Sequence, residues 1–282
     1  MSGLGPRASK ELLDRFGLRP RTSIGQHFVT DPNTVRRIVE IAGVRHGEQV
    51  LEIGPGLGAL SLAILEAGAT LIAVERDDRL KPVLGEVLED RARIVWDDAM
   101  SVDYPRLLGR RETRHVSNLP YQIATPLILD LLTHVPAITT HTVMIQREVG
   151  ERLVAPPGAD AYGAASVKVA ALADARIAMR VSKRVFFPIP DVESVVLQID
   201  RRAQQPTSAA RERLFAVVDA GFGQRRKTIR RALAGGGWHP AAVEHALERA
   251  GIPGEARAET LGVEEFRALA TALPPSPRAA RR

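Results

Sequence analysis

The segment Asn118-Leu119-Pro120-Tyr121 combines the groups needed to hold an exocyclic amine of a planar ring. The lone pair of such an amine is delocalised into the ring, so the nitrogen becomes nucleophilic only when acceptors on its two hydrogens draw it toward tetrahedral geometry. Asn118 Oδ1 can accept one hydrogen and the Leu119 carbonyl the other. Pro120 favours extended geometry at Leu119 and adds no N–H of its own, while Tyr121 can stack on the ring. The segment therefore predicts methylation of a nucleobase nitrogen.

The same segment also has a purely structural interpretation. A strand that ends in a proline turn would use Asn118 as the turn former and Tyr121 as packing at its rim. A four-residue match does not separate the two interpretations. The elements that precede the segment therefore matter, because they decide which ligand lies beside it.

A glycine-rich turn ends the first candidate strand, in the run Leu51-Glu52-Ile53-Gly54-Pro55-Gly56-Leu57-Gly58, and a helix pattern over Ala59–Ala67 follows it. Glycines at alternate positions let the backbone turn sharply and pass close to a ligand. Dinucleotide-binding enzymes use the spacing G-x-G-x-x-G, whose N–H groups meet a pyrophosphate. Here the spacing is G-x-G-x-G after the acid Glu52, which suits a ligand with a cation or an amine. S-adenosylmethionine meets that description, with Glu52, Gly54 and Gly56 as contacts.

Two further acids follow the next strands. Glu75 ends the second strand, about 20 residues beyond the glycine loop, where an acid typically binds ribose hydroxyls. Asp98 follows the third strand beside Ala99 and can accept from an adenine amine while the flanking backbone contacts the ring. Each acid alone also suits a turn or a helix start. Ligands bind outside the carboxyl ends of such strands, so this order, closed by Asn118, predicts a cofactor site beside the amine pocket.

Short apolar runs alternate with amphipathic helical patterns from Gln49 to about Ile199, which is typical of an α/β domain with a mostly parallel sheet. The candidate strands are Gln49–Ile53, Thr70–Val74, Arg93–Trp96, His115–Ser117, Thr142–Gln146, Ile177–Val181 and Val195–Ile199. Residues 201–208 have the composition of a linker, and no strand candidate follows them. We therefore predict a Rossmann-like catalytic domain of residues 1–202 with an N-terminal entry segment. A small C-terminal all-helical domain of residues 203–282 follows it, with a disordered tail from Pro274.

The C-terminal domain carries a basic cluster and its own candidate core. The cluster consists of Arg225, Arg226, Lys227, Arg230 and Arg231, which share a helix pattern with the apolar residues Phe222, Ile229 and Leu233. The candidate core residues are Leu261, Phe266, Leu269 and Leu273. The basic face can bind phosphates of folded RNA. A solvated basic helix is the alternative.

The order of these motifs resembles that of the ribosomal RNA adenine N6,N6-dimethyltransferases, most closely their bacterial small-subunit (16S) members, from about Phe16 to Ala272. The likeness also includes Gly25-Gln26-His27-Phe28-Val29, Gln146-Arg147-Glu148-Val149, Ala161-Tyr162-Gly163, Phe186-Phe187-Pro188-Ile189-Pro190-Asp191-Val192-Glu193-Ser194 and Phe222-Gly223-Gln224-Arg225-Arg226-Lys227-Thr228-Ile229-Arg230. The last two segments are more specific than the glycine loop. The fold implied by the resemblance is that of a class I S-adenosylmethionine-dependent methyltransferase.

The resemblance also implies a site and a substrate. The family's contacts with the methyl donor S-adenosylmethionine fall on His27, Val29, Gly54, Glu75, Asp98 and Asn118, and Phe186 would face Tyr121 across the target adenine. Members methylate two adjacent adenines, each twice, in a hairpin loop near the 3′ end of small-subunit rRNA, late in subunit assembly. The expected partners are therefore small-subunit rRNA and the assembling small ribosomal subunit.

Three positions depart from the family's usual residues, and we expect altered donor binding rather than its loss. His27 stands where Asn is common, Val29 where Leu is common, and Gln122 where Asn often follows the Tyr.

One alternative function is a 23S rRNA adenine N6-methyltransferase of the macrolide-resistance type, against which the motif from Phe222 to Arg231 argues. Another is a non-catalytic RNA-binding assembly factor, against which the intact Asn118, Tyr121 and Glu75 argue. A nicotinamide-dependent oxidoreductase is a more distant alternative.

Composition narrows the remaining possibilities. The 282 residues include no cysteine, which excludes disulfides and thiolate metal sites, and the seven histidines lack metal-binding spacing, so no metal is predicted. The N-terminus lacks the pattern of a signal peptide and no apolar run has membrane-spanning length. A cytosolic monomer without membrane contact is expected. The net charge of +6 and the pI near 10.1 favour a polyanionic partner such as nucleic acid.

Overall fold

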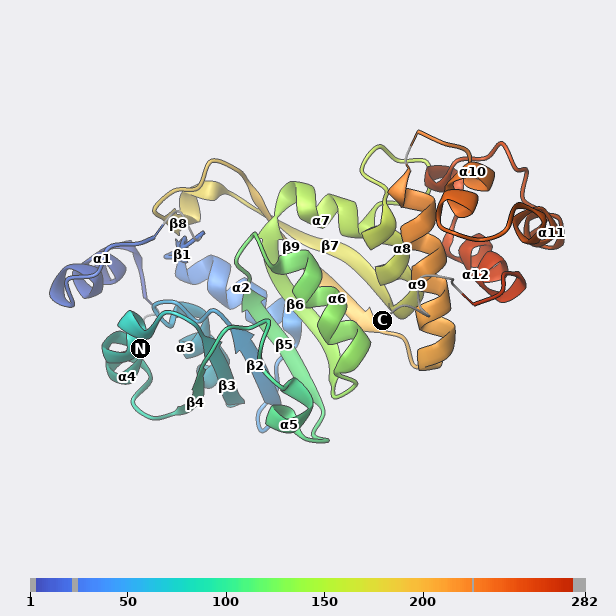
Figure 1. Ribbon diagram of the computed structural model, residues 1–282. Coiled ribbons are helices and arrows are strands. Elements are labelled where there is room, and N and C mark those ends of the chain that lie inside the picture. Colours follow the sequence, from blue (N-terminus) through green and yellow to red (C-terminus); the bar gives the residue numbers. More distant parts are fainter. Residues whose placement is uncertain (1–3, 22–24, 225, 276–282) are drawn as a thin grey trace. The chain divides into compact units, whose positions relative to one another are not determined.

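A computed structural model describes residues 4–21, 25–224 and 226–275 (Figure 1). The chain divides into two compact units. The first consists of Met1–Gly150 and Ala175–Arg201, and the second of Glu151–Asp174 and Arg202–Arg282.

The first unit is built on a seven-stranded sheet of order β4-β3-β2-β5-β6-β9-β7. Its strands are β2 (Gln49–Ile53), β3 (Thr70–Glu75), β4 (Ala92–Trp96), β5 (Thr113–Asn118), β6 (Ile138–Gln146), β7 (Ala173–Val181) and β9 (Ser194–Arg201). The pairs β3–β4, β2–β3, β2–β5 and β5–β6 are parallel, and β9 runs antiparallel to β6. All seven predicted strands are confirmed. β6 and β7 begin earlier than predicted, because polar residues such as Thr139 and Asp174 interrupt their apolar pattern.

Helices cover both faces of this sheet (Figure 1). On one face, α2 (Pro32–Ala42) and α3 (Ala59–Glu66) pack on alternate strand residues that include Val50, Val116 and Met144. The helix α4 (Lys81–Leu88) follows the 3-10 turn η2 (Asp78–Leu80) and shares a core with Leu57. The remaining helices of this unit are α1 (Pro6–Arg15), α5 (Tyr104–Leu108), α6 (Ala124–His134) and the start of α7 (Arg147–Val154).

A two-stranded antiparallel sheet joins the entry segment to the chain after β7. It pairs β1 (Phe28–Val29) with β8 (Phe186–Phe187), which follows the turn η3 (Lys183–Val185). Thr30 N extends the contact by donating to the Val185 carbonyl over 2.8 Å. Strands of two residues carry no hydrophobic period, so the sequence pattern could not indicate them.

The second unit is all helical. It contains α8 (Ala164–Leu172), α9 (Ser208–Gly223), α10 (Ile229–Gly235), α11 (Pro240–Ala250), η4 (Ala258–Thr260) and α12 (Val263–Ala272). The predicted core residues Leu261, Phe266, Leu269 and Leu273 are buried in it. The segment Glu151–Asp174 lies in this unit rather than in the sheet unit, which the proposed boundary after residue 202 did not anticipate. The reason is packing: Tyr162 joins the helical core and donates to the Leu261 carbonyl over 2.8 Å.

The basic cluster does not lie on one helix, contrary to the prediction. α9 ends at Gly223 and α10 begins at Ile229, so Arg226 and Lys227 lie in the connection. Thr228 starts the new helix by accepting a hydrogen bond from Arg231 N. Arg225 and residues 276–282 of the predicted tail lie outside the described residues. The predicted tail began at Pro274, but the Pro274 carbonyl accepts from Trp238 Nε1 over 2.9 Å. None of the described helices is long and apolar enough to cross a membrane.

Candidate functional site

A cavity of about 480 Å³ opens at the carboxyl ends of β2, β3, β4 and β5, within the sheet unit. Its lining contains every predicted donor-binding residue and the predicted amine pocket. These residues are His27, Val29, Glu52, Gly54, Gly56, Glu75, Asp98, Ala99, Asn118, Leu119, Pro120 and Tyr121. The predicted convergence of the strand ends is therefore confirmed, while the role of each side chain stays a prediction.

The glycine loop between β2 and α3 requires glycine for two physical reasons. Gly54 and Gly56 have φ of 73° and 59°, which side chains rarely adopt. A Cβ on Gly56 would also lie 2.8 Å from Phe28 Cδ1. The loop is anchored at its start, where Ile53 N donates to Ser117 Oγ over 2.8 Å. The backbone can thus border the cavity closely.

Glu75 holds this loop from the end of β3. Its carboxylate accepts hydrogen bonds from Gly56 N at 3.3 Å, Arg76 N at 2.9 Å and Asp77 N at 2.8 Å. The side chain is buried, and burial raises the pKa of Glu75 although the backbone donors oppose that shift. Each carboxylate oxygen has more than one lone pair, so the acid retains capacity to accept from a ligand hydroxyl.

Glu52 lies beneath the loop and is more deeply buried than the sequence indicated. Its carboxyl group is 2.5 Å from Ser61 Oγ on α3. Burial raises the pKa of Glu52 to about 8, and the nearby Glu75 charge adds to that shift. The carboxyl group is therefore mostly protonated at neutral pH. A cation brought into the cavity would favour its ionised form.

Asp98 faces the cavity after β4, and a second acid that sequence reasoning missed lies near it. Asp98 Oδ1 accepts from Met100 N over 2.9 Å, and its Oδ2 lies 3.3 Å from Arg76. The missed acid, Asp77, accepts from Gln26 Nε2 over 2.7 Å. The hydrogen bond with Arg79 lowers the pKa of Asp77 to about 2. Gln26 belongs to the motif of residues 25–29, which resembles the family. That motif is the sequence feature that could have indicated a contact between the entry segment and the cavity.

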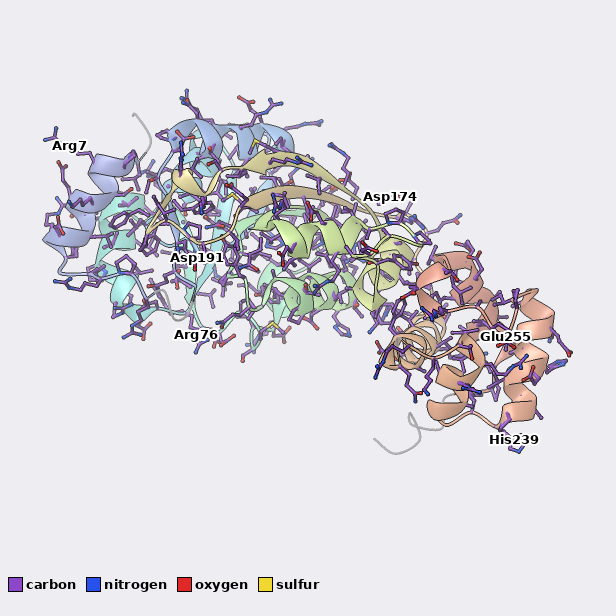
Figure 2. The ribbon with its side chains drawn as sticks, turned by 90° about the horizontal axis from the view of Figure 1, so that it is seen from above. Arg7, Arg76, Asp174, Asp191, His239 and Glu255 are labelled. Carbon is purple, nitrogen blue, oxygen red and sulfur yellow. The ribbon has the colours of Figure 1, made fainter. Side chains whose placement is uncertain are left out.

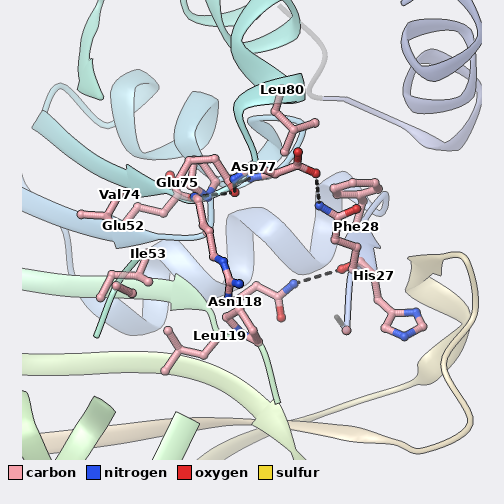
Figure 3. Close-up of a pocket in the computed structure, with 18 of the residues that line it drawn as sticks. His27, Phe28, Glu52, Ile53, Val74, Glu75, Asp77, Leu80, Asn118 and Leu119 are labelled. Atoms are coloured by element: carbon pink, nitrogen blue, oxygen red, sulfur yellow. Dashed lines mark hydrogen bonds between the residues drawn. The ribbon is translucent and has the colours of Figure 1, made fainter. Parts of the chain in front are cut away.

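The amine pocket presents two unused acceptors. Asn118 Nδ2 donates to the His27 carbonyl over 3.3 Å (Figure 3), which directs Oδ1 away from that contact. Leu119 N donates to the Met144 carbonyl over 3.0 Å and fixes the strand end. Within the described part of the chain, no group donates a hydrogen bond to Asn118 Oδ1 or to the Leu119 carbonyl. Both oxygens are thus available to an amine.

Two aromatic side chains stack on each other at this pocket. The rings of His27 and Tyr121 are stacked, with centroids 6.2 Å apart and planes 22° from parallel. The hydroxyl of Tyr121 forms a hydrogen bond with Ser194 Oγ over 3.1 Å. His27 Nδ1 lies 2.8 Å from the Pro188 carbonyl. Neither Pro188 nor Ser194 was singled out from the sequence, although both belong to the family-like motif from Phe186 to Ser194.

The structure does not bring Phe186 to the cavity, contrary to the expectation that it faces Tyr121. Its side chain is 2% exposed and packs in the core with Val29 and Val35. The register of β1 with β8 pairs Phe186 with Val29, which turns the ring inward. A role for Phe186 opposite a bound ring stays a prediction.

The basic cluster of the helical unit separates into two kinds of residue. Arg230 is engaged by two acids, Glu244 at 2.7 Å and Glu255 at 3.4 Å. Arg226, Lys227 and Arg231 are exposed and form no ion pair with any described residue. These three remain available for a polyanion.

The sequence model of the family described as "Ribosomal RNA adenine dimethylase" matches residues 17–273, nearly the whole chain. The chain belongs to this family. Relatives of this chain include two proteins named "Ribosomal RNA small subunit methyltransferase A". The one from Kineococcus radiotolerans is 45% identical, covering 98% of this chain and 94% of that protein. The one from Streptomyces avermitilis is 46% identical, covering 95% and 92%.

Solved structures confirm that this family member has the expected fold. The 23S rRNA methyltransferase ErmE matches with a TM-score of 0.68 and 28% identity, covering 87% of this chain and 99% of that chain. A dimethyladenosine transferase from Plasmodium falciparum matches with a TM-score of 0.72 and 21% identity, covering 86% and 96%. The second likeness concerns the fold alone. The Rossmann-like methyltransferase sheet with a helical C-terminal portion is thus confirmed.

Proposed function

We propose that this protein is a small-subunit (16S) rRNA adenine N6,N6-dimethyltransferase that uses S-adenosylmethionine. The observation that carries the proposal is the pair of unused acceptors, Asn118 Oδ1 and the Leu119 carbonyl, at the edge of a cavity ringed by acids. Support for the substrate comes from the relatives at 44–46% identity, whose names specify the small subunit.

The cavity residues fit S-adenosylmethionine. The loop at Gly54 and Gly56 admits a ligand where side chains would clash or strain the backbone. Glu75 would accept from ribose hydroxyls and Asp98 from the adenine amine of the donor. The negative potential of these acids suits a cationic ligand. When bound, S-adenosylmethionine supplies an electrophilic methyl group.

The amine pocket would prepare the acceptor nitrogen. In the first transfer Asn118 Oδ1 and the Leu119 carbonyl would each accept one N6 hydrogen, and these bonds strengthen as the nitrogen becomes tetrahedral. In the second transfer the monomethylated nitrogen has a single hydrogen, so one of the two oxygens would accept it. Holding the nitrogen in line with the methyl group supplies the rest of the catalysis. The base must leave its stack to enter, and stacking on Tyr121 offsets part of that cost, because base–aromatic stacking contributes about 1–3 kcal/mol.

The partner is expected to be rRNA in the assembling small subunit. The exposed Arg226, Lys227 and Arg231 would bind phosphates, and this contribution is independent of base sequence. Recognition of the target would then depend on an unpaired base that reaches the amine pocket.

The test is a methyl-transfer assay with ribosomal particles. The protein is incubated with labelled S-adenosylmethionine and small subunits from an unmethylated strain, and modified nucleotides are mapped. We expect two methyl groups on N6 of each of two adjacent adenines of small-subunit rRNA. Absence of label in small subunits would contradict the proposal, as would methylation at another atom.

A second candidate function is methylation of large-subunit rRNA. The likeness to the 23S rRNA methyltransferase ErmE, at 28% identity over nearly all of that chain, favours it. The same assay with naked 23S rRNA and with large subunits decides between the two. Label confined to these substrates would establish the second candidate.

A further inference from the structure

Large apolar side chains are exposed in one short loop beside the amine pocket. Among the residues that the structure describes, four large hydrophobic side chains are exposed, and three of them lie between positions 187 and 192. They are Phe187 at 38%, Ile189 at 60% and Val192 at 38%; the fourth is Met100 at 47%. We name residues 187–192 the apolar loop. Apolar side chains that gather at the surface mark a binding site more often than isolated ones do.

The apolar loop is held in a defined conformation. Lys183 N donates to Glu193 Oε2 over 2.8 Å, and Lys183 Nζ donates to the Asp191 carbonyl over 3.2 Å. These bonds join the segment before the loop to residues at and just after its end. Pro188 and Pro190 further restrict the backbone between them. A loop ordered before binding loses less entropy when a ligand binds it.

Two hydrogen bonds attach the loop to the amine pocket itself. His27 Nδ1 contacts the Pro188 carbonyl within the loop, and Tyr121 contacts Ser194 just after it. The stacked pair of His27 and Tyr121 thus lies between the pocket and the loop. An RNA strand whose base enters the pocket would bring its neighbouring nucleotides close to the apolar loop.

The charges around the loop favour a polyanion. Arg180 and Arg184 precede it; both are exposed and form no ion pair with a described residue. Asp191, labelled in Figure 2, contributes one exposed acid, and Glu193 is bonded to the backbone of Lys183. Exposed apolar side chains next to unpaired arginines suit a nucleotide, whose base is apolar on its faces and whose phosphate is anionic.

We propose that the apolar loop binds the unpaired nucleotide next to the target base, with the base packed on Phe187 and Ile189 and a phosphate on Arg184. This inference rests on the proposed function, because it concerns the RNA strand that supplies the target. It assigns a second base-binding position outside the donor cavity. The enzyme would therefore read two nucleotides of a single-stranded loop rather than one.

The test uses Ile189→Ala, with Met100→Ala as a matched control outside the loop. Both side chains are exposed, so neither change removes core packing. The substrate is an RNA hairpin carrying the mapped target adenine, either intact or with an abasic nucleotide at the flanking position. We expect Ile189→Ala to raise the Kd for the intact hairpin about tenfold, because the change removes apolar side-chain area that the packed base would bury. The abasic hairpin should bind the wild type and Ile189→Ala equally.

The charge on the loop is tested separately with Arg184→Gln and the control Arg110→Gln, both exposed positions. Arg184→Gln should lower the slope of log Kd against log salt concentration for hairpin binding by about one, because one fewer phosphate is neutralised. The control should leave this slope unchanged. Donor affinity, measured by calorimetry, should be unchanged in all four variants. A change in donor affinity for Ile189→Ala would mean that the loop supports the cavity instead, and would overturn the inference.

Outcomes for the inference and for the proposed function are distinguishable. If the wild type transfers no methyl group to small-subunit rRNA, the proposed function fails. If the wild type methylates it while Ile189→Ala binds both hairpins as the wild type does, the inference alone fails. Weakened binding of Ile189→Ala to intact small subunits with unchanged hairpin binding would instead indicate a protein partner and also overturn it.

Discussion

Asn118 Nδ2 donates a hydrogen bond to the backbone carbonyl of His27, across 3.3 Å and 91 positions of sequence. This bond fixes which end of the amide faces the pocket. Because the nitrogen is used by the entry segment, Oδ1 is the atom left to accept from a substrate amine. The entry segment therefore sets the chemistry of the pocket as well as bordering it.

Replacing Asn118 with Ala should slow methyl transfer more than it weakens donor binding. The change removes an acceptor whose bond strengthens in the transition state, and such bonds contribute about 1.5–3 kcal/mol. We expect kcat to fall by about one to two powers of ten, with a smaller change in donor affinity by calorimetry. The control is Asn33→Ala on the exposed surface of α2. Unchanged turnover in Asn118→Ala would remove the residue from the mechanism.

Replacing His27 with Asn, the residue common in the family, tests the ring contact. The change removes the stacking on Tyr121 and alters the bond to the Pro188 carbonyl. Aromatic pairs contribute about 0.5–1.5 kcal/mol, so we expect KM for RNA to rise by about twofold to tenfold while kcat stays near the wild-type value. His27→Phe should restore KM in part, because it keeps the ring. A fall in kcat with unchanged KM would contradict this.

The meeting of four site residues at the strand ends could be predicted, because short stretches of sequence indicate each strand. Apolar runs indicate parallel strands, and parallel strands bring Gly54, Glu75, Asp98 and Asn118 to one edge. The bond between His27 and Pro188 could not be predicted, since 161 positions separate them and a two-residue strand pairing aligns them. The same pairing buries Phe186 and exposes Phe187. Two adjacent phenylalanines do not show by themselves which of the two is buried. Burial of Glu52 likewise depends on how α3 packs on β2.

The buried Glu52 should make the donor-free protein less stable as pH rises. Its folded-state pKa of about 8 exceeds the usual value, so between pH 4.5 and 8 the folded protein binds more protons than the unfolded chain. This contribution to stability is therefore complete below pH 4.5 and is lost by pH 8. Glu52→Gln should raise the free energy of unfolding at pH 8 by a few kcal/mol, and by much less at pH 5. Equal shifts at both values in urea titrations would contradict the assignment.

A pair of buried histidines should determine stability on the acid side. His115 on β5 and His141 on β6 have Nδ1 atoms 3.0 Å apart, are fully buried, and have no described partner for Nε2. Burial lowers the pKa of His115 to about 3 and that of His141 well below its usual value. The unfolded chain then binds more protons below pH 6.5, so stability is lost as pH falls from 6.5 toward 3.

The test of this pair is the double replacement His115→Leu with His141→Leu. Each histidine contributes a slope of about 1.4 kcal/mol per pH unit, so the unfolding free energy of the double variant should fall less steeply between pH 6.5 and 4.5. The exposed His245→Leu is the control. A double variant with the wild-type slope would show that other groups govern the acid transition.

The exposed basic residues of the helical unit should affect RNA binding, whereas Arg230 should not. Neutralising Arg226, Lys227 or Arg231 to Gln should lower the slope of log Kd against log salt concentration by about one for each phosphate that the variant no longer neutralises. Arg230→Gln should instead lower the melting temperature slightly, because its ion pairs with Glu244 and Glu255 are largely exposed and contribute little. Arg249→Gln, exposed on α11, is the matched control and should change neither. A slope unaffected by the first three changes would place the RNA-binding surface elsewhere.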